Sequence, residues 1–479
     1  MKITFIYPDL NLGKFNFGIG YLSSVLKAHG HHTDLIHLKD YINEETFTQV
    51  LRQKNPDLIA FSCSTNMFAY TKQLVSWARR CLKDTPIICG GIHPTLCPEE
   101  VIGIKDVDMV CVGEGEEALL ELCDNLRQGK TIDNIENIWL KKNGNIYRNP
   151  VRPLIADLDS LPFPDRDMFT KSALTEDEAL NACAVMASRG CPYDCSYCCN
   201  HALKNTYQGK GPYVRFKAVS RVMDEIEEIL KKHNFDAIIF HDDIMPFRKD
   251  WLTDFSKEYK ARIGLPFICN LRVDLADQDS LRMLKEAGCI QVCLGIESGN
   301  EFIRNAVMQR KISEQQIADA FGLCRKLGIR TKSFNMVGLP FEDMEKILDT
   351  IKLNVAVRPD VIQVSIFYPY PKTELFKLCA HKNLISQAKN LVSYFDGSIL
   401  SLPRMSQEQV YFARKRFVRM YKRYSFYKKL PQFIGNFLEK ISDLIFKLPL
   451  TAKTYVLQRN FSQAIKSRRK KRAGGRRVF

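Results

Sequence analysis

The fold of this 479-residue chain is decided by residues 188–198, which read S-R-G-C-P-Y-D-C-S-Y-C. Cys191, Cys195 and Cys198 follow the spacing C-x3-C-x2-C, directly after an apolar run, Ala182–Met186, that predicts a strand. Cysteine thiolates are the usual protein ligands of iron–sulfur iron, and three at such short separations can wrap one cubane cluster. The loop offers no obvious fourth ligand, so one iron would stay open for a small molecule. The alternative is a chance group of buried thiols, and we interpret Cys199 as a structural thiol.

Length and composition predict a globular protein of two or three domains. The apolar fraction of 45% is ordinary for a chain with real cores. The 16 cysteines are scattered apart from those at 191–199, which excludes a small disulfide framework. Residues 1–7 run straight into a strand-like segment, and no apolar run approaches the roughly 18 residues of a membrane span. We therefore expect a reduced, cytoplasmic protein.

The positive charge of the chain lies almost entirely near its C-terminus. Residues 404–479 hold 21 Lys and Arg against 3 Asp and Glu, a local charge of +18, whereas the rest of the chain sums to −2. The overall charge of +16 therefore describes the C-terminal region and says little about the remaining residues.

Residues 1 to about 130 alternate short apolar strands with amphipathic helices. The predicted strands are Ile3–Tyr7, Thr33–His37, Leu58–Ser62, Ile87–Gly90 and Met109–Val112. Two of the predicted helices are Tyr21–His29 and Tyr70–Lys83. This alternation predicts a doubly wound, Rossmann-like parallel sheet that binds a ligand outside the carboxyl ends of its strands.

Small and turn-forming residues follow those strand ends. They are Pro8 after the first strand, Ser64 and Thr65 after the third, Gly90, Gly91 and His93 after the fourth, and Gly113, Glu114 and Gly115 after the fifth. Glycine lets the backbone approach a bulky ligand closely. An α/β module with another ligand, or with none, is the alternative interpretation.

Residues 135–180 join this domain to the next. Ile135–Leu140 and Asn145–Arg148 flank Asn143-Gly144 and predict a hairpin, because Asn-Gly favours a two-residue turn. The proline-rich stretch Val151–Pro164 predicts a linker too stiff for a helix.

Strand and helix then alternate six times between residue 182 and about residue 375. The predicted strands are Ala182–Met186, Asp236–Phe240, Pro266–Leu271, Cys289–Ile296, Arg330–Val337 and Val361–Tyr368. Ser220–Lys232 and Ser313–Lys326 are two of the predicted helices. In β/α barrels the chemistry lies at the C-terminal strand ends, and polar residues gather at these ones.

The cysteine motif strongly resembles that of the radical S-adenosylmethionine (SAM) enzymes. The resemblance implies a partial, six-stranded (β/α) barrel and a [4Fe–4S] cluster whose open iron chelates the amino and carboxylate groups of SAM. Tyr197 matches the aromatic residue that the family places before its third cysteine.

The same resemblance implies a set of SAM-binding residues. In G-I-E-S-G at 295–299, Glu297 matches the carboxylate that binds the sugar hydroxyls, with Ser298 beside it. Asp242 and Asp243 match the position that holds the amino group. Candidate partners of the carboxylate are Arg272, Arg310 and Lys311, and Gly338 belongs to the fifth strand end. Helix capping is the alternative role of Asp243. Phe341 and Lys372 stand where the family has glycine.

The N-terminal domain resembles the cobalamin-binding domain that precedes many radical SAM barrels. The matching pieces are residues 17–22 (F-G-I-G-Y-L), 90–95 (G-G-I-H-P-T) and 113–116 (G-E-G-E). The resemblance implies that Pro8, Ser64, Thr65, Gly90, Gly91, His93, Gly113, Glu114 and Gly115 line the cobalamin site. The motif D-x-H-x-x-G, which supplies a histidine to cobalt elsewhere, is absent. We therefore expect no histidine on cobalt.

The C-terminal region is predicted to be helical and basic. Phe412, Phe417, Met420, Tyr421 and Tyr424 recur at helical spacing among Arg and Lys, and a second apolar series runs from Phe433 to Ile445. One interpretation is a helical domain packed on the barrel. The other is a basic amphipathic surface that attaches weakly to anionic lipid, which would suit a lipid-like substrate. We expect disorder in Lys466–Arg477, because its apolar content is low.

The resulting domain prediction has five parts. They are a cobalamin-binding domain (1–134), a hairpin and linker (135–180), a radical SAM partial barrel (181–395), a helical domain (396–465) and a basic tail (466–479).

The resemblance implies carbon methylation. In that chemistry a 5′-deoxyadenosyl radical takes hydrogen from an unactivated carbon and methylcobalamin supplies the methyl group, so no protein acid or base is obligatory. The alternative is a non-methylating cyclase or rearrangement enzyme, as in anaerobic tetrapyrrole cyclisation. A methylthiotransferase is disfavoured because the N-terminal cysteines form no close motif. A nucleic-acid-binding sensor is disfavoured because no helix-turn-helix or RNA-binding motif appears.

The expected partners follow from this chemistry. They are a small-molecule substrate and an electron donor such as flavodoxin or ferredoxin, with peripheral contact between the basic C-terminal region and the inner face of the membrane. No nucleic acid is expected.

Overall fold

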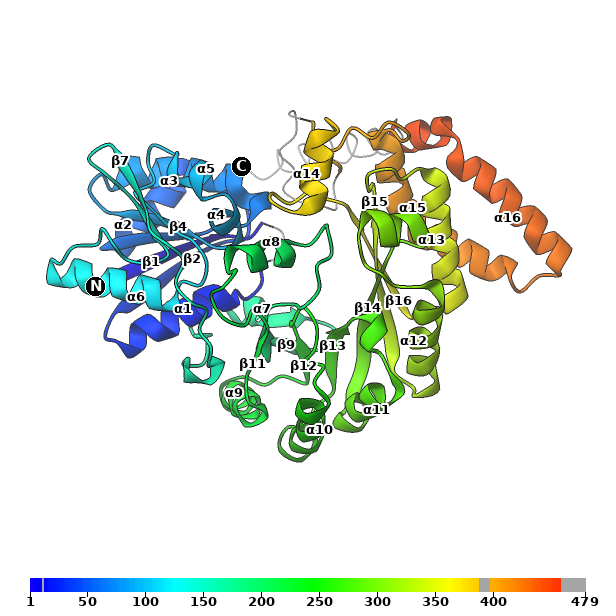
Figure 1. Ribbon diagram of the computed structural model, residues 1–479, viewed down its shortest axis with the longest axis horizontal. Helices are drawn as coiled ribbons and strands as arrows, with labels where there is room; N and C mark the ends of the chain where they lie inside the picture. The colour runs from blue at the N-terminus through cyan, green and yellow to red at the C-terminus, as the bar shows by residue number, and fades with distance from the viewer. Residues whose placement is uncertain (11–12, 387–396, 458–479) are drawn as a thin grey trace, which may run out of the picture. The chain divides into compact units, whose positions relative to one another are not determined.

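The computed structural model describes residues 1–10, 13–386 and 397–457 (Figure 1). The chain divides into two compact units. The first holds Met1–Cys293, Lys326–Ile329 and Pro369–Lys377. The second holds Leu294–Arg325, Arg330–Tyr368 and the described residues from Leu378 onward.

A seven-stranded sheet opens the first unit. Its strands are β1 (Lys2–Pro8), β2 (His32–Leu38), β3 (Leu58–Ser62), β4 (Ile87–Gly90), β5 (Met109–Cys111), β6 (Ile138–Lys142) and β7 (Asn145–Arg148). The order is β2-β1-β3-β4-β5-β6-β7, and the pairings from β2 to β5 are parallel. The register aligns Ile3 with Leu58 and Ile59 with Ile87. The predicted doubly wound sheet is confirmed, and the predicted hairpin extends it as antiparallel β6 and β7.

Helices alternate with these strands. They are α1 (Phe17–Ala28), α2 (Glu44–Lys54), α3 (Phe68–Cys81), α4 (Ile92–Leu96), α5 (Pro98–Ile102) and α6 (Glu116–Gln128), with a 3₁₀ turn, η1, at Thr65–Met67. Helix α1 begins four residues earlier than predicted because Asn16 accepts a hydrogen bond from the Ile19 amide at 2.9 Å, satisfying an otherwise unpaired helix donor.

The proline-rich linker forms no α-helix before residue 171. It contains a 3₁₀ turn, η2 (Leu158–Ser160), and then α7 (Lys171–Leu174). Arg166 anchors it, because this buried side chain donates to the Ala184 carbonyl at 2.8 Å and stacks over Phe15 at 4.3 Å.

A second seven-stranded sheet follows. Its strands are β8 (Thr175–Asp177), β9 (Ala182–Val185), β12 (Ala237–Phe240), β13 (Phe267–Leu271), β14 (Cys289–Glu297), β15 (Arg330–Val337) and β16 (Val361–Ile366). The order is β16-β15-β14-β13-β12-β9-β8, and the division between the two units falls within β14. All six predicted strands are present and form the predicted partial barrel. β8 adds an antiparallel edge strand that the sequence did not indicate. A small separate ladder pairs β10 (Ser188–Arg189) with β11 (Arg215–Phe216).

Helices separate these strands as well. They are α8 (Cys199–Thr206), α9 (Val219–Lys232), α10 (Lys249–Arg262), α11 (Gln278–Ala287), α12 (Glu314–Lys326), α13 (Met344–Val357) and α14 (Glu374–His381), with a 3₁₀ turn, η3 (Val273–Leu275), and a π-helical turn, η4 (Phe302–Val307). Helix α9 buries Val222, Ile226 and Ile229, whose spacing places them on one face. Asp277 caps the start of α11, and Gly288 ends it at φ 109°.

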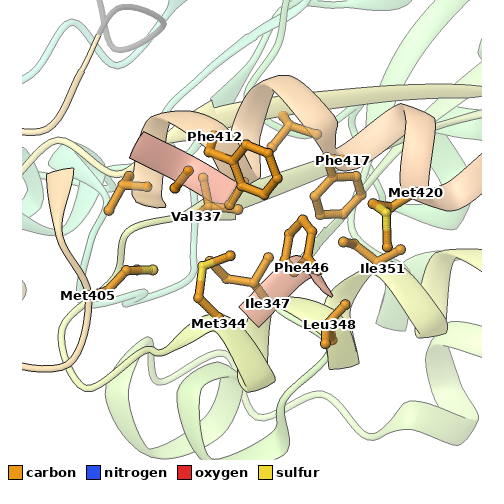
Figure 2. Packing of buried hydrophobic residues seen from close by; sticks show 14 of the residues in the cluster. Val337, Met344, Ile347, Leu348, Ile351, Met405, Phe412, Phe417, Met420 and Phe446 are labelled. Atoms are coloured by element: carbon orange, nitrogen blue, oxygen red, sulfur yellow. The ribbon is translucent and has the colours of Figure 1, made fainter. Parts of the chain in front are cut away.

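The described C-terminal region is helical, as predicted. It contains α15 (Gln407–Tyr427) and α16 (Gln432–Lys447). A capping box between Ser406 and Gln409 starts α15. In Figure 2, Phe412 and Phe417 of α15 pack with Ile347 and Ile351 of α13. The predicted tail, 466–479, lies outside the described residues. Among the described helices, none is long and apolar enough to cross a membrane.

Candidate active site

The predicted cluster-binding loop, residues 188–199, is called the cluster loop below. It leaves β9 through β10, where Arg189 pairs with Arg215 of β11. Gly190 follows at φ 87°, and a Cβ there would overlap the Tyr213 carbonyl oxygen. Glycine is therefore required for the chain to turn into Cys191.

Two of the three predicted cluster cysteines receive hydrogen bonds from side-chain N–H groups. Arg272 donates a hydrogen bond from Nη1 to the Cys195 sulfur at 3.4 Å. Asn200 donates one from Nδ2 to the Cys198 sulfur at 3.8 Å. Burial raises the pKa of the Cys191 thiol to about 12, so the loop by itself favours thiols, and bound iron would have to stabilise the thiolates.

The two aspartates after β12 occupy different environments. Asp242 is buried and accepts hydrogen bonds from the Ala187 amide at 3.1 Å and from the Ser188 hydroxyl. Burial raises its pKa to about 6. Asp243 is exposed and hydrogen-bonds to Asn200. The protein around it excludes part of its hydration shell, and this desolvation raises the pKa of its carboxyl. Accessibility decides which carboxylate can meet a ligand directly, and this criterion favours Asp243. Asp242 instead holds the start of the cluster loop.

Arg272 lies against the cluster loop within the first unit. Its guanidinium is buried, donates to Asp274 at 2.7 Å and stacks over the Tyr193 ring at 3.8 Å. The structure thus brings Arg272 to Cys195. Tyr197, in the same loop, is half-buried.

Residues 295–299 in the second unit, called the Glu297 loop, are held mainly by backbone packing. Glu297 adopts φ 63°, and Arg310 lies 3.5 Å from its carboxylate. Arg310 also donates to the Gly295 carbonyl at 2.9 Å. A Cβ on Gly299 would lie 2.5 Å from the Thr350 Cα, so only glycine fits there.

The other predicted residues of the second unit divide into buried and exposed groups. Ser298 is fully buried, and its carbonyl accepts a hydrogen bond from Arg304 at 2.9 Å. Lys311 is exposed. Gly338, at φ 81°, donates its amide to Glu342 at 2.6 Å, and a Cβ there would lie 2.8 Å from Val410 of α15.

The two positions where the family's glycines are missing keep the glycine conformation. Phe341 has φ 65° and Lys372 has φ 66°. Side chains rarely adopt this left-handed region because Cβ approaches the backbone too closely. Both positions therefore carry backbone strain that glycine would relieve.

The carboxyl ends of β1, β3, β4 and β5 lie at one edge of the first sheet, because these strands are parallel. Pro8 is buried as the last residue of β1, and Thr65 and Gly90 are half-buried. Ser64 and Gly91 are exposed, and beside them Ile92 is 46% exposed. Gly91, at φ 103°, packs so closely on Cys63 that a Cβ would lie 2.9 Å from its carbonyl oxygen.

His93 is buried behind this edge. Its ring packs on Phe68 with the centroids 4.0 Å apart, and Nδ1 lies 3.3 Å from the Thr65 hydroxyl. Nε2 faces the Glu100 carboxylate at 3.7 Å. Burial lowers the pKa of His93 to about 4, so the imidazole is neutral at physiological pH.

Gly113, Glu114 and Gly115 connect the first sheet to the cluster loop. Gly113 leaves room for the Tyr207 phenol, which would overlap any Cβ there, and Gly115 packs on Leu22. The Glu114 carboxylate binds Arg189 at 2.9 Å and Arg215 at 2.8 Å. Burial raises the pKa of Glu114, but the hydrogen bonds and charges of the two arginines outweigh it and hold the pKa below its ordinary value.

Comparison with known families assigns the first sheet and the second sheet to two different domains. Residues 15–123 match the B12 binding domain, and residues 185–353 match the Radical SAM superfamily. The chain is a cobalamin-binding radical SAM protein.

Similar proteins support this assignment. An uncharacterized methyltransferase of Pyrococcus horikoshii is 26% identical over 410 residues, covering 85% of this chain and 87% of that protein. The anaerobic magnesium-protoporphyrin IX monomethyl ester cyclase of Cereibacter sphaeroides is 26% identical over 400 residues, covering 79% of this chain and 63% of that protein. The structure of the cobalamin-dependent SAM radical enzyme OxsB, with aqua-cobalamin and SAM bound, matches with a TM-score of 0.67 at 17% identity. It covers 93% of this chain and 71% of OxsB, and shows a shared fold.

The cofactors of this radical SAM protein are a [4Fe–4S] cluster, SAM and cobalamin. The cluster loop fits an iron–sulfur cluster, because Arg272 and Asn200 direct N–H donors at the sulfurs of Cys195 and Cys198, two of the three predicted ligands. The sheet edge fits cobalamin at Ser64, Gly91 and Ile92, which are open to solvent. The SAM candidates divide between the units: Tyr197, Asp242, Asp243 and Arg272 belong to the first, and Glu297, Ser298, Arg310, Lys311 and Gly338 to the second.

Sequence reasoning missed three residues that position these loops. Arg189 and Arg215 hold Glu114, and Arg304 holds the Glu297 loop through the carbonyls of Ser298 and Gly299. Arg189 stands two residues before Cys191, which is a local signal. Arg215 and Arg304 carry no signal in the sequence, because their partners are backbone groups or distant side chains.

Proposed function

We propose that this chain methylates an unactivated carbon of a small-molecule substrate. When bound, the cluster and SAM supply a 5′-deoxyadenosyl radical that removes a hydrogen atom, and cobalamin supplies the methyl group. The observation that carries this proposal is the ion-pair network of Glu114. Through it, a loop of the B12 binding domain is held 2.9 Å from Arg189, at the entrance of the cluster loop. The proposed cobalamin-binding edge and the cluster loop thus belong to one packed unit, which supports sequential use of the two cofactors.

The proposed roles of the residues follow their environments. Cys191, Cys195 and Cys198 ligate the cluster. Asp243 contacts the amino group of SAM, and its exposure supports this role, whereas Asp242 and Arg272 position the cluster loop. Glu297 binds the sugar hydroxyls of SAM. Tyr197, Ser298, Arg310 and Gly338 stay candidates from the resemblance.

We propose that cobalamin binds the exposed edge near Ser64 and Gly91, with no protein histidine on cobalt. The burial of His93 under Phe68, with Nε2 facing Glu100, supports this proposal. Electron paramagnetic resonance of the cob(II) form is the test. Nitrogen superhyperfine splitting from an axial ligand would contradict the proposal.

The domain boundaries are also a proposal. The matched ranges 15–123 and 185–353 fall inside the proposed domains 1–134 and 181–395, which supports that division.

Small-molecule substrates and an electron donor accompany radical SAM chemistry. We propose that the donor is a flavodoxin or ferredoxin, that the chain acts in the cytoplasm, and that its basic C-terminal region contacts the membrane surface. The local charge of +18 in residues 404–479 supports that contact.

The experiment that tests methylation is anaerobic reconstitution followed by incubation with methyl-deuterated SAM and a reductant. Methylation should release 5′-deoxyadenosine and S-adenosylhomocysteine and place the deuterated methyl group on a product in candidate substrate extracts, measured by mass spectrometry. The triple variant with alanine at 191, 195 and 198 is the control, and should lose the cluster absorbance and both co-products.

A cyclase is the second candidate, favoured by the 26% identity to the magnesium-protoporphyrin ester cyclase. It would release 5′-deoxyadenosine without S-adenosylhomocysteine or methyl transfer. That result would overturn the methylation proposal and leave the cofactor assignment intact.

A further inference from the structure

Helix α16 turns an apolar face toward solvent. The side chains on that face, called the α16 stripe, are Phe433, Ile434, Phe437, Ile441, Leu444, Ile445 and Leu448. Phe433 is 76% exposed, and Phe437 and Leu444 are each 63% exposed. Their spacing of three or four residues places them on one side of the helix. Surface helices usually turn such a face toward the core, so α16 has the reverse orientation.

The opposite face of α16 attaches the helix to the second unit. Phe446 enters the core beside Phe412 and Phe417 (Figure 2). Gly435 lets the helix approach Tyr427 so closely that a Cβ would lie 2.6 Å from the Tyr427 carbonyl oxygen. The Tyr427 hydroxyl lies 3.0 Å from that of Ser442.

Charged side chains fix the rotation of α16. Lys352 of α13 binds Asp443 at 2.8 Å and Glu439 at 3.0 Å. Rolling the α16 stripe inward would break both ion pairs and withdraw Phe446 from the core. The exposure of the stripe is therefore built into the packing. Single exposed apolar residues are ordinary, but a continuous exposed stripe marks an interaction surface.

The charge around the α16 stripe indicates what covers it. Arg419 and Lys422 lie on α15, two turns and one turn before the exposed Phe426. Lys429 lies between α15 and α16, and Lys440 lies on α16 itself. Within the described residues, no carboxylate lies within 4 Å of these four basic groups. The sequence after residue 457 adds nine Lys and Arg and no acidic residue. A surface that combines an apolar stripe with unneutralised positive charge is complementary to anionic lipid headgroups over an acyl layer.

We propose that the α16 stripe docks on an anionic lipid bilayer, with the helix lying in the plane of the headgroup interface. α16 has 16 residues and does not qualify as a membrane span, which fits a helix that lies on the surface. This proposal deepens the membrane contact proposed above and is independent of methyl transfer. It assigns the hydrophobic contribution to Phe433, Phe437 and Leu444. The basic tail contributes electrostatic attraction to the anionic headgroups.

Sedimentation of the full chain with vesicles of phosphatidylglycerol and phosphatidylcholine tests the proposal. Wild type should pellet with the anionic vesicles more than with pure phosphatidylcholine, and less at high salt, since salt screens exposed charges. The double variant Phe433→Ser, Phe437→Ser should lower partitioning by about tenfold or more per phenylalanine. Both side chains are exposed, so the fold should persist, as circular dichroism can verify. Tyr41→Ser, at a 62% exposed tyrosine of the first unit, is the matched control and should bind like wild type.

A second variant separates the stripe from the tail. Replacing the basic residues between 466 and 477 with serine should weaken binding and reduce its salt dependence, because each basic side chain near the surface contributes about fivefold. If this variant loses binding while Phe433→Ser, Phe437→Ser retains it, the stripe proposal is overturned and the electrostatic contact stands. The proposal would also be overturned if the wild-type chain forms a dimer that does not bind vesicles, and if replacing the two phenylalanines dissociates that dimer. The stripe would then bind a second copy of this chain.

Discussion

The strand-end loops of the two units are stabilised in different ways. In the first unit, charged side chains from distant segments hold the cluster loop: Glu114 binds Arg189 and Arg215, and Asp242 binds Ser188. In the second unit, the Glu297 loop is held at its backbone: Gly299 lies directly against α13, and the Arg304 side chain donates to the carbonyls of Ser298 and Gly299. The cluster loop should therefore be sensitive to the loss of a charge, and the Glu297 loop to the addition of a single carbon atom.

The largest effect is expected at Gly299. Gly299→Ala should destabilise the fold by about 3 kcal/mol or more, because the new Cβ meets the backbone of Asp349 and Thr350, which cannot move without displacing α13. Gly322→Ala on α12 is the control: nothing lies within 4 Å of its Cβ position, and alanine should stabilise the helix by up to about 1 kcal/mol. Urea unfolding measures both. Equal urea midpoints for the two variants would show that Gly299 has room for a Cβ and would contradict the prediction.

The second effect concerns Glu342, which accepts the Gly338 and Leu339 amides after β15. Burial raises its pKa to about 8, from 4.5. Between these pH values the folded state binds more protons than the unfolded state, so stability should fall as pH rises, by up to about 1.4 kcal/mol for each pH unit. Glu342→Gln should flatten this dependence and be the more stable form at pH 9. If the stability of Glu342→Gln falls with pH as steeply as that of wild type, other groups cause the dependence.

The third effect tests the charged attachment of the cluster loop. Glu114→Gln should cost about 2–3 kcal/mol, because it leaves the buried Arg215 without its carboxylate and Arg189 with Glu116 as its remaining partner. It should also lower iron retention after reconstitution. Glu117→Gln, whose ion pair with Arg152 is exposed, should change stability by less than about 1 kcal/mol. Iron content and thermal unfolding of the two variants give the comparison, and equal iron retention would deny Glu114 its positioning role.

The fourth effect concerns the ligand-binding role of the Glu297 loop. Glu297→Ala should weaken SAM binding by about ten- to hundredfold, because a buried hydroxyl loses its acceptor, and should leave the cluster absorbance intact. Glu301→Ala, at an exposed position four residues later, should bind SAM normally. Anaerobic calorimetry is the measurement. Unchanged affinity for Glu297→Ala would remove this residue from the site.

The smallest effect compares one strained position in each unit. Lys372→Gly and Phe341→Gly should each stabilise the protein by about 1 kcal/mol or less, because glycine adopts their positive φ without strain. Lys372→Gly should gain more, since Phe341 also contacts the Phe302 ring. Lys377→Gly, in the helix α14, should instead destabilise by about 1 kcal/mol. Destabilisation by Lys372→Gly would show that its side chain offsets the strain.

The sequence by itself determined the order of the secondary structure and the residues of the cluster loop. Alternating apolar strands and amphipathic helices are local patterns, so β3, β4 and β15 have their predicted bounds. The spacing of Cys191, Cys195 and Cys198 is local as well. Local signals also predicted the turn at Asn143-Gly144, since only a few residue pairs favour that backbone conformation.

Only the tertiary structure decided how these residues are used. Asp242 and Asp243 are neighbours in the sequence, yet one is buried against Ser188 and the other is exposed, because burial depends on the segments that pack around them. The sequence placed Glu114 at the strand ends where a ligand binds. It did not indicate the two arginines that bind Glu114, because they lie 75 and 101 residues further along the chain. The apolar series from Phe433 to Ile445 was visible in the sequence. Its outward direction was not, because Lys352 and the core around Phe446 determine the rotation of α16.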